Sequence, residues 1–470
     1  MIILVLESST SGAKALRIDT VTGDMDIKVE PYAKGTQENA EEVWKTTAKL
    51  GKQLAATVEK VDIIALGGVW HSVMLCDKHF KPVTRVYHWY DTSSYELCTK
   101  IRNENPSFTQ EFYSKTGCRV HSLYPYFKLL PLKMKGQIKQ DYKICGQGTF
   151  NFFQLTGDWK VSKSMASGTG LFDIHNKVYH QGLLGNLGID SKTQLGKLVD
   201  YESTSPLSKE GAKLLGLPSG IPVVPCHPDG ALNQIGSSAN EKGIMTLSIG
   251  TSGAMRLSTD KPILNFEKGN WCYYGATKSW LSGAATSGCC NCVDYYKDLL
   301  FSAELSYRTI EDTMKEDNIN TPIFLPFLFG ERCPGWDDGK KASFFDCKPE
   351  ATTQDYYQAV LEGVLFNLYQ CFDTLSTVEK INCIKVSGGI LQSKTWKQMC
   401  ADIFGLEIEE DRVKQCSLFG GAKLAAMVLK TQIPENTHNS KVLPNMKMHD
   451  MYMKKYNRYL YWYDITKEKN

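Results

Sequence analysis

The sequence lacks any long run of hydrophobic residues and any large excess of charge. No stretch approaches the roughly twenty apolar residues that are needed to cross a bilayer, and the formal net charge of the 470 residues is only +3. The first residues, MIILVLESS, have no basic flank and soon reach Glu7, so they predict a buried strand and not an export signal. We therefore expect a cytoplasmic protein that binds a small molecule, and neither a membrane nor a nucleic acid as its main partner.

The sequence also lacks the paired CxxC spacing of structural zinc sites. Its 15 cysteines are an odd number, which in this setting favours reduced thiols over a disulfide framework. The densest group is Cys289, Cys290 and Cys292. Two interpretations stay open for this group: packing beside an active-site loop, which the spacing favours, and metal binding.

A repeated pattern of strand, tight turn and strand is present. The tetrapeptide Thr-Ser-Gly-Ala occurs at residues 10–13 and again at residues 251–254. Each copy follows a run of β-branched residues and Leu, and each precedes an alternation of apolar and basic residues. Such a turn leaves backbone N–H groups and hydroxyls pointing outward, where they can bind phosphate. The two copies predict a phosphate-binding hairpin in each half of the chain.

The segments between the two hairpins have an α/β pattern. Residues 39–60 carry apolar residues at helical spacing and lead into strand-like segments, which predicts an α/β fold with a mainly parallel sheet. A chain of this length is too long for one compact core. We predict two domains, residues 1–241 and 242–470, with the boundary between residues 240 and 243.

Asp229 is the residue that we predict to carry the chemistry. It follows the apolar strand IPVVPC and precedes the second hairpin. An Asp-Gly pair by itself indicates a simple turn, but an acid at the carboxyl end of a buried strand stands over the crevice at the end of the sheet. If ATP lies on the two hairpins, Asp229 meets the acceptor hydroxyl. An ordinary pKa of about 4 suffices, since phosphoryl transfer depends more on orienting the nucleophile than on basicity.

Two charged residues flank the first turn. Glu7 ends the first strand, and we predict that it holds Mg²⁺ through water against the phosphates. Lys14 follows the turn and adds positive charge at the same place.

Three segments of the first half are candidates for substrate binding. His71 follows a glycine pair and a Trp, which favours a binding cleft over a structural role. Trp89 and Asp91 could hold a polyhydroxylated ligand by ring stacking and hydroxyl binding, or they could form an aromatic cap with Asp91 as a helix N-cap. The segment around Tyr124 introduces a helix whose Lys residues we predict to face solvent.

The second half offers an arginine and two glycine pairs. Arg332 could bind a phosphate or a substrate carboxylate, although Glu331 beside it could neutralise it. Gly388-Gly389 lies at a strand-to-helix corner, where a nucleotide can approach the backbone. Gly420-Gly421 is predicted to open one more helix at the same pocket. Residues 354–377 predict a core helix, and the polar tail after residue 441 predicts a surface appendage.

The chain resembles the FGGY family of carbohydrate kinases, in the actin-like, ribonuclease-H-like ATPase superfamily, from Ile3 to about Val428. The motifs that carry the resemblance are VSGGILQSKTWKQMCADIFGLEI, SLFGGAKLAA, LSIGTSGAMRL and PDGALNQIGSSA. Within the family it is most similar to gluconokinases, in TGCRVHSLYPYFKL, SMASGTGLFDIH and FGERCPGW. The resemblance implies two actin-like α/β domains with a cleft between them, ATP and Mg²⁺ as cofactors, and the phosphorylation of gluconate to 6-phosphogluconate.

The resemblance also implies roles for individual residues, with Asp229 as the base. The predicted ATP-binding residues are Thr10, Ser11, Gly12 and Lys14 in the first phosphate motif, Gly250, Thr251 and Ser252 in the second, and Gly388 and Gly389 in the adenosine motif. The predicted substrate-binding residues are His71, Trp89, Asp91, Tyr124, Asp229 and Arg332, and the predicted metal residue is Glu7.

The chain departs from the family pattern at several positions. The first phosphate motif usually begins with Asp, where this chain has Glu7, and has a Gly at the position of Ser9. Ser93 replaces the Arg of the WxDxR sugar motif, and Pro131 replaces a Trp. Substrate identity is therefore less defined than the reaction.

Two alternatives to gluconate phosphorylation stay open. One is a kinase for a neutral ketose or polyol such as xylulose or glycerol, and the other is a non-catalytic sensor of a sugar or nucleotide. Arg332, Lys163 and His71 are the candidates for binding a substrate carboxylate. A homodimer is compatible with the sequence.

Overall fold

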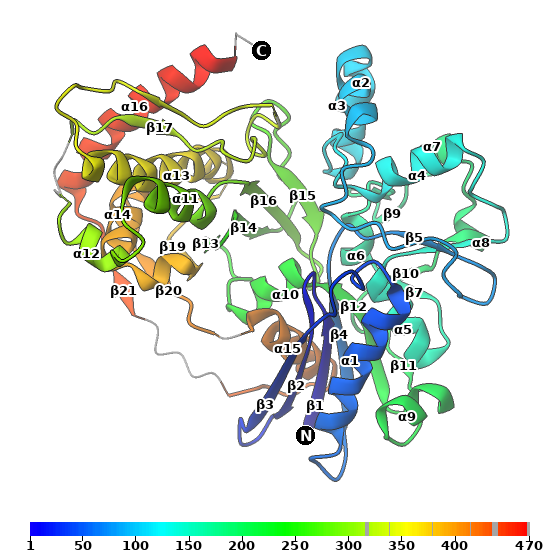
Figure 1. Cartoon of the computed structure of the whole chain (residues 1–470). Coiled ribbons are helices and arrows are strands. Elements are labelled where there is room, and N and C mark those ends of the chain that lie inside the picture. Colours follow the sequence, from blue (N-terminus) through cyan, green and yellow to red (C-terminus); the bar gives the residue numbers. More distant parts are fainter. Residues whose placement is uncertain (315–318, 338, 378, 414, 435–439, 468–470) are drawn as a thin grey trace.

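The computed structural model describes residues 1–314, 319–337, 339–377, 379–413, 415–434 and 440–467. The chain forms two halves, each built on a β-sheet with helices against it (Figure 1). The first sheet takes its strands from residues 2–228 and the second from residues 244–442. The domain boundary at residues 240–243 remains a prediction. Within the described ranges, no helix is long and apolar enough to cross a membrane.

The first sheet has six strands. Their order is β11 (Ser205–Pro206), β12 (Pro222–Pro228), β4 (Ile63–Gly68), β1 (Ile2–Ser8), β2 (Gly12–Asp19) and β3 (Met25–Pro31). β4 pairs in parallel with both β1 and β12, whereas β2, β3 and β11 run antiparallel to their neighbours. The parallel trio brings the carboxyl ends of β1, β4 and β12 to one edge of the sheet, where Glu7 and His227 both pair with Gly67.

The second sheet has seven strands. Their order is β15 (Trp271–Tyr274), β16 (Trp280–Thr286), β14 (Gly253–Thr259), β13 (Ile244–Ile249), β19 (Cys383–Gly388), β20 (Ile408–Glu410) and β21 (Lys441–Val442). Only β13, β19 and β20 run parallel. The prediction of a mainly parallel sheet is therefore wrong, because the short turns of each half can join only antiparallel strands.

Both predicted hairpins are present. β1 and β2 pair in antiparallel fashion from Ile2 with Asp19 to Ser8 with Ala13, and β13 and β14 pair from Met245 with Leu257 to Ile249 with Gly253. The strands that form them are almost entirely buried. Each hairpin therefore projects its turn from a rigid core.

The helices and short strands of the first half complete its core and a helical extension, at the right of Figure 1. They are α1 (Ala40–Ala55), β5 (Met74–Cys76), α2 (Tyr95–Glu104), α3 (Pro106–Thr116), α4 (Pro125–Met134), β6 (Lys143–Cys145), α5 (Gln147–Thr156), β7 (Lys160–Ser162), α6 (Lys163–Ser167), β8 (Phe172–Asp173), β9 (Val178–Tyr179), α7 (Gln181–Leu187), α8 (Ser191–Gln194), β10 (Lys197–Val199), α9 (Lys209–Leu215) and α10 (Asp229–Gly236). The predicted helix at residues 39–60 is α1, which begins after Asn39 because the Asn39 side chain accepts the N–H groups of Glu41 and Glu42.

The remaining elements surround the second sheet. They are α11 (Cys290–Leu300), α12 (Tyr307–Glu311), β17 (Ile323–Leu325), β18 (Ser343–Phe345), α13 (Thr353–Ser376), the 3₁₀ turn η1 (Gly389–Gln392), α14 (Lys394–Phe404), α15 (Cys416–Val428) and α16 (Met446–Lys467). The core helix predicted at residues 354–377 is α13, whose first turn is closed by a capping box between Thr352 and Asp355.

Helix α15 joins the two halves near the bottom of Figure 1, where it packs against α10, β1 and β4. The close approach requires glycine, because a Cβ on Gly420 would lie 1.8 Å from the carbonyl oxygen of Leu232, and one on Gly236 would lie 2.0 Å from that of Cys416. The prediction that Gly420-Gly421 opens a helix is wrong, since α15 begins at Cys416 and the glycines lie in its interior.

The prediction of a surface appendage after residue 441 is also wrong. Helix α16 buries Tyr459 and Tyr463 completely, and the fully buried Lys455 forms an ion pair with Glu362 of α13. The segment is rich in Tyr, Met and Lys, and this mixed composition does not indicate which face of the helix is buried. The packing against α13, α14 and β17 shows that face.

Candidate active site

The first turn lies between β1 and β2 and is closed by its own serine. The N–H and hydroxyl of Ser9 both donate to the carbonyl of Gly12, at 3.0 and 2.6 Å. Gly12 is required here because a Cβ would lie 2.7 Å from the carbonyl oxygen of Glu30. Thr10 and Ser11 lie at the tip, half-buried and exposed, respectively. The turn thus presents hydroxyls outward, as phosphate binding requires.

Glu7 and Lys14 face each other across this hairpin. They are partners in the strand register, and the Lys14 ammonium lies 3.0 Å from Glu7 Oε1. Glu7 is fully buried, and neither of its carboxylate oxygens accepts a hydrogen bond from any described residue. A buried carboxylate with unused acceptors suits a hydrated cation. The described residues hold no group of three or more His, Cys, Asp or Glu that could hold a metal alone, so Glu7 would need the phosphates as further ligands.

Asp229 is the first residue of α10, directly after β12. Its Oδ1 accepts a hydrogen bond from the Gly230 N–H at 2.7 Å, which fixes the direction of the carboxylate. Burial, together with the charge of Glu7, raises the pKa of Asp229 to about 6, and the charges of Arg256 and Lys14 oppose the rise. This pKa is well above the predicted value of about 4, because burial disfavours the charged form. Asp229 is therefore a stronger proton acceptor than an exposed carboxylate.

The second turn connects β13 and β14 and is supported by helix α11. The Gly250 N–H donates to the Ser252 carbonyl at 3.1 Å, and the Cys290 N–H donates to the Gly250 carbonyl at 2.9 Å. The side chains of Thr251 and Ser252 are exposed. This turn resembles the first one in presenting hydroxyls to solvent.

The glycine pair predicted for the adenosine motif lies beside the second turn. Gly388 is the strand partner of Ile249, and it has φ = 97°, which favours glycine. A Cβ on Gly388 would lie 2.3 Å from the Ile249 carbonyl oxygen, and one on Gly389 would lie 2.7 Å from Cys290 Sγ. The fold thus brings the second phosphate motif and the predicted adenosine motif together.

The cysteine group is packed against this region. Cys289 and Cys292 are fully buried, and Cys289 Sγ lies where a side chain on Gly253 would be. Cys290 is half-buried, and burial raises its pKa to about 11. The thiols are therefore protonated near neutral pH and act as small packing residues here.

His71 lies in an aromatic wall. It has φ = 63°, and its Nδ1 donates to the Gly168 carbonyl at 2.5 Å, so that Nε2 remains an acceptor. Burial lowers the pKa of His71 to about 3, which keeps the ring neutral. Tyr124 packs edge-on against it at 5.1 Å between ring centroids, and the Tyr124 hydroxyl lies 2.8 Å from that of Tyr273 on β15. His71 and Tyr124 thus lie together, as the prediction of a shared substrate site requires.

Arg332 lies near this wall, and no ion pair joins it to Glu331. Glu331 instead forms a buried ion pair with Lys340 at 3.2 Å and accepts the Tyr463 hydroxyl. The positive charge of Arg332 contributes to lowering the pKa of His71, and Trp336 of the same loop lies 5.3 Å from the ring of His121. The possibility that Glu331 neutralises Arg332 is therefore wrong, whereas Arg332 stays a candidate for anion binding.

Arg256 is a site residue that the sequence interpretation missed. It lies on β14, and its Nε is buried beside Gly230, where a Cβ on that glycine would lie 3.3 Å away. Burial lowers the pKa of Arg256, and the charge of Asp229 raises it. The alternation of apolar and basic residues after the second turn was a signal, since it puts every second side chain on one face of β14.

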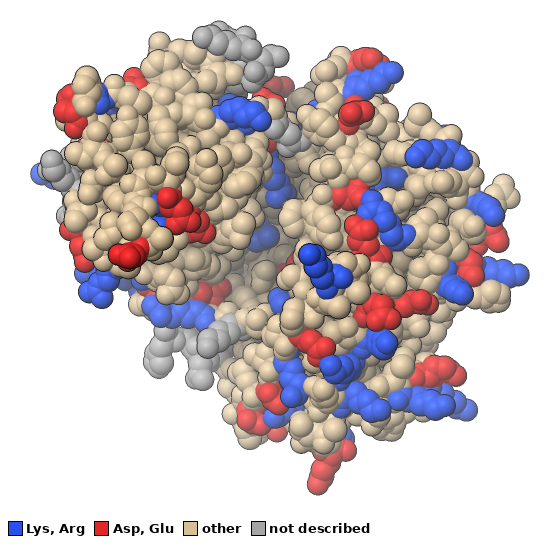
Figure 2. All heavy atoms as spheres, in the orientation of Figure 1, with Lys and Arg blue, Asp and Glu red and all other residues tan. Residues whose placement is uncertain are grey.

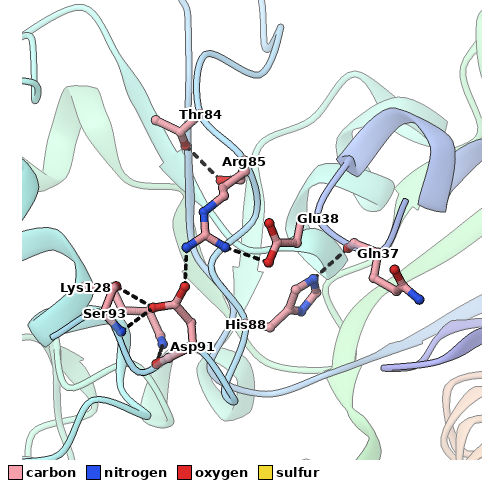
Figure 3. Close-up of polar contacts among 8 residues, drawn as sticks. All are labelled: Gln37, Glu38, Thr84, Arg85, His88, Asp91, Ser93 and Lys128. Carbon is pink, nitrogen blue, oxygen red and sulfur yellow. Dashed lines mark hydrogen bonds and ion pairs between the residues drawn. The ribbon is translucent and has the colours of Figure 1, made fainter. Parts of the chain in front are cut away.

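Asp91 is engaged by protein groups (Figure 3). Its carboxylate forms an ion pair with Arg85 and accepts the N–H of Ser93, and Arg85 also pairs with Glu38 at 2.6 Å. The Nζ of Lys128 donates to the Asp91 carbonyl at 3.0 Å. The first helix after this loop is capped at Ser94, so Asp91 is not the N-cap. Sugar binding by Asp91 remains a prediction, but its carboxylate already has two partners.

Lys128 corrects another expectation. It lies on α4 and is 2% exposed, whereas we predicted that the lysines of this helix face solvent. Burial lowers the pKa of Lys128 to about 8, and the charge of Asp91 opposes the fall. The sequence could not show this burial, because the partner lies 37 residues away in the chain.

Two other predicted residues have separate partners. The indole N–H of Trp89 donates to the Thr10 hydroxyl at 3.1 Å, so Trp89 contacts the first turn and is 39% exposed. Lys163, a candidate for carboxylate binding, forms an ion pair with Asp200 at 2.8 Å. That pairing makes Lys163 the weakest of the three candidates.

A groove runs between the two halves of the molecule. Figure 2 shows this groove, with Lys and Arg side chains along its walls. The charges of Glu7, Lys14 and Arg256 act on the pKa of Asp229, and the charge of Arg332 acts on the pKa of Arg256. The first turn belongs to the first half of the molecule and the second turn to the second half. The aromatic wall combines His71 and Tyr124 of the first half with Tyr273 of the second.

Comparison with known proteins identifies relatives along most of the chain. Residues 19–236 match the N-terminal domain of the FGGY family of carbohydrate kinases, and residues 245–429 match its C-terminal domain. The gluconokinase of Bacillus subtilis (strain 168) is 29% identical over 416 residues, which cover 84% of this chain and 80% of that protein. The xylulose kinase of Staphylococcus xylosus is 25% identical over 436 residues, covering 88% and 89%, respectively.

Solved structures agree with these similarities. The crystal structure of gluconate kinase from Lactobacillus acidophilus superposes with a TM-score of 0.90 at 25% identity, covering 99% of this chain and 98% of that one. A ligand-bound xylulose kinase from the same organism superposes with a TM-score of 0.91, also at 25% identity, covering 100% and 99%.

Proposed function

The chain belongs to the FGGY family of carbohydrate kinases, and we propose that it transfers the terminal phosphoryl group of ATP to D-gluconate to form 6-phosphogluconate. The observation that carries the proposal is the position of Asp229. This half-buried carboxylate is close enough to Glu7, Lys14 and Arg256 for their charges to act on its pKa, and the Nε of Arg256 lies beside the neighbouring Gly230. Asp229 therefore lies where an acceptor hydroxyl would meet a phosphate held by the turns.

Asp229 acts as the general base in this proposal. The backbone N–H of Gly230 orients its carboxylate, and the pKa of about 6 leaves it ionised at neutral pH while raising its affinity for the hydroxyl proton. The acceptor hydroxyl donates to Asp229 as its oxygen attacks the phosphorus. Because the proton is transferred late in a loose transition state, the main role of Asp229 is to orient the hydroxyl.

The two turns hold the nucleotide in this proposal. Backbone N–H groups and hydroxyls of Thr10 and Ser11, and of Thr251 and Ser252, bind phosphate oxygens, and Gly388-Gly389 lets the adenosine approach the backbone. Glu7, whose carboxylate contacts Lys14 and accepts no hydrogen bond from a described residue, fits the binding of hydrated Mg²⁺. Bound Mg²⁺ supplies neutralisation of the charge on the phosphates.

Gluconate is supported as the acceptor by the gluconokinase relatives and by the positive charge beside Asp229. The charge of Arg332 acts on Arg256, whose Nε lies beside Gly230, and His71 offers an acceptor for a sugar hydroxyl. Xylulose kinases are almost equally similar to this chain, so a neutral ketose or polyol such as xylulose or glycerol is the alternative acceptor. A non-catalytic sensor is a further alternative, and an Asp229 with a fixed orientation and a raised pKa argues against it.

A coupled assay of ADP release tests the proposal. The purified chain is supplied with ATP, Mg²⁺ and one acceptor at a time from a panel of aldonates, ketoses and polyols. We expect the highest kcat/KM with D-gluconate. A strong response to xylulose with none to gluconate would instead support the ketose kinase, and no turnover with any acceptor would support the sensor.

A further inference from the structure

Two arginines of the groove have no acidic partner. The Nε of Arg256 is buried and donates to no described residue, and neither its guanidinium nor that of Arg332 forms an ion pair within the described part of the chain. Glu331, the acid nearest to Arg332 in sequence, is occupied by Lys340. Unpaired buried cations are unfavourable, and each depends on an anion or water to compensate the loss of solvation.

Arg256 lies in a pocket with aromatic walls. Its strand partner on β16 is Gly283, where a Cβ would lie 2.4 Å from the Trp271 ring, so the missing side chain lets the indole lie over the strand beside Arg256. Trp271 stacks on Tyr273 at 4.5 Å, and Tyr273 lies 4.9 Å from the ring of Trp70. Such walls exclude water and strengthen the interaction between an arginine and an anion.

The two arginines lie on the acceptor side of the groove. Arg256 follows Ser252 by four residues, so its Cα lies about 13 Å along the strand from the second phosphate turn. Arg256 interacts electrostatically with both Asp229 and Arg332, whereas Arg332 interacts with His71 and Tyr124. The N–H of Cys333, the residue after Arg332, donates to the Ala285 carbonyl on β16 at 3.0 Å, and β16 pairs with the strand of Arg256. Trp336 of the same loop lies 5.3 Å from the ring of His121, so the loop of Arg332 packs against both β16 and the segment that leads to Tyr124.

We propose that Arg256 and Arg332 jointly bind the carboxylate of an aldonic acid whose terminal hydroxyl lies at Asp229. This assignment rests on the proposed kinase function and specifies how that site would select its acceptor. A guanidinium matches a carboxylate in bidentate geometry, and one anion compensates both half-buried charges. A neutral ketose or polyol brings no such compensation, so the pair would select for sugar acids.

The test compares a sugar acid with a neutral molecule of the same carbon skeleton. We would measure kcat/KM for D-gluconate and for D-glucitol, and KM for ATP, in the wild type and in Arg332→Met, Arg256→Met and Arg256→Lys. Arg308→Met serves as the control, because the Arg308 side chain is 91% exposed on α12. The melting temperature of each variant checks its folding, and Arg256→Lys keeps the charge if the Met variant at that position does not fold.

We expect Arg332→Met to lower kcat/KM for D-gluconate by about 100-fold, with less than about a fivefold change for D-glucitol and for KM of ATP. Arg256→Met should also lower kcat/KM for D-glucitol, because the charge of Arg256 acts on the pKa of Asp229, but it should lower kcat/KM for D-gluconate further. Arg256→Lys should lie between wild type and Arg256→Met, because Lys keeps the charge and loses the fork. Equal losses on both acceptors, or a raised KM for ATP with unchanged use of D-gluconate, would overturn the assignment.

Calorimetric binding separates this assignment from the proposed function. If the wild type does not phosphorylate D-gluconate, the proposed function fails, and the pair is then tested by direct binding of D-gluconate and D-glucitol. Preferential binding of D-gluconate that is lost in Arg332→Met supports the arginine pair in that case. No preference for the acid would show that the pair does not bind carboxylates.

Discussion

The ammonium group of Lys14 lies 3.0 Å from Oε1 of Glu7, across the first hairpin, where the two residues are partners in the strand register. This contact holds a fully buried carboxylate in place without using its hydrogen-bonding capacity, since no described donor bonds to it. It also places a negative charge beside Asp229, whose pKa it helps to raise. Glu7 therefore links the predicted metal site to the predicted base.

Replacing Glu7 by Gln should weaken the binding of Mg²⁺. We expect the Mg²⁺ concentration for half-maximal activity to rise by about 10- to 100-fold, which is the usual loss of affinity when a residue that supports a bound metal is replaced. Glu7→Asp, which introduces the residue usual in the family, should retain most activity. Titration of ADP release with Mg²⁺ measures both, and an unchanged titration in Glu7→Gln would exclude Glu7 from metal binding.

The same substitution should shift the pH dependence of the enzyme. Because the charge of Glu7 raises the pKa of Asp229, its removal lowers that pKa. The acidic limb of kcat/KM against pH, which lies near pH 6 in the wild type, should therefore move to lower pH in Glu7→Gln. A profile that stays in place would mean that Glu7 does not act on the group that titrates.

Asp229→Asn should lower kcat by about 10² to 10⁴-fold, the usual range for loss of a general base. In the wild type, Asp229 is protonated below its pKa of about 6, so kcat/KM should fall tenfold per pH unit below that value. Equilibrium binding of ATP should be nearly unchanged in the variant. Near-normal turnover of Asp229→Asn would remove the residue from the role of base.

Arg85→Met and Asp91→Asn should have the same phenotype. Each variant removes the charge of one member of the ion pair between Arg85 and Asp91 and leaves the other member unpaired. We therefore expect a loss of about 1 to 3 kcal/mol in the free energy of unfolding, measured by chemical denaturation. KM for gluconate should change little in either variant. A raised KM in Asp91→Asn, with unchanged stability, would instead show that Asp91 binds the sugar.

Glu38→Gln is the matched control for the Arg85 network. It removes one partner of Arg85 and leaves the contact with Asp91 intact. Since both Arg85 and Glu38 are partly exposed, we expect less than about 1 kcal/mol of destabilisation. An effect as large as that of Arg85→Met would mean that the contact with Asp91 is not the important one.

Gly420→Ala should push apart helices α10 and α15, whose packing joins the two halves. The added Cβ would lie 1.8 Å from the Leu232 carbonyl oxygen, so we expect a loss of about 3 kcal/mol in the free energy of unfolding. Gly185→Ala in α7 is the control, because a Cβ there meets nothing within 4 Å. That variant should be neutral or more stable by up to about 1 kcal/mol. Equal stabilities would show that α10 and α15 can move apart freely.

The sequence predicted the elements that depend on local patterns. The hairpins at residues 10–13 and 251–254, the start of α1 after Asn39 and the core helix α13 follow from periodicity, turn residues and capping, all of which act over a few residues. The buried tyrosines of α16 did not follow, because a mixed composition does not show which face meets a partner. The mixed strand directions of both sheets were also missed, since pairing depends on distant strands.

The sequence by itself determined the family, the two hairpin turns that we predict to bind phosphate and the place of Asp229 at the end of a strand, because motifs and strand ends are local features. Only the tertiary structure decided the pKa of Asp229, the burial of Lys128 and the pairing of Asp91 with Arg85. It alone placed Arg256 of β14 beside Gly230, where its charge acts on Asp229. These properties depend on solvent exclusion and on charges brought together from distant segments, which no single stretch of sequence contains.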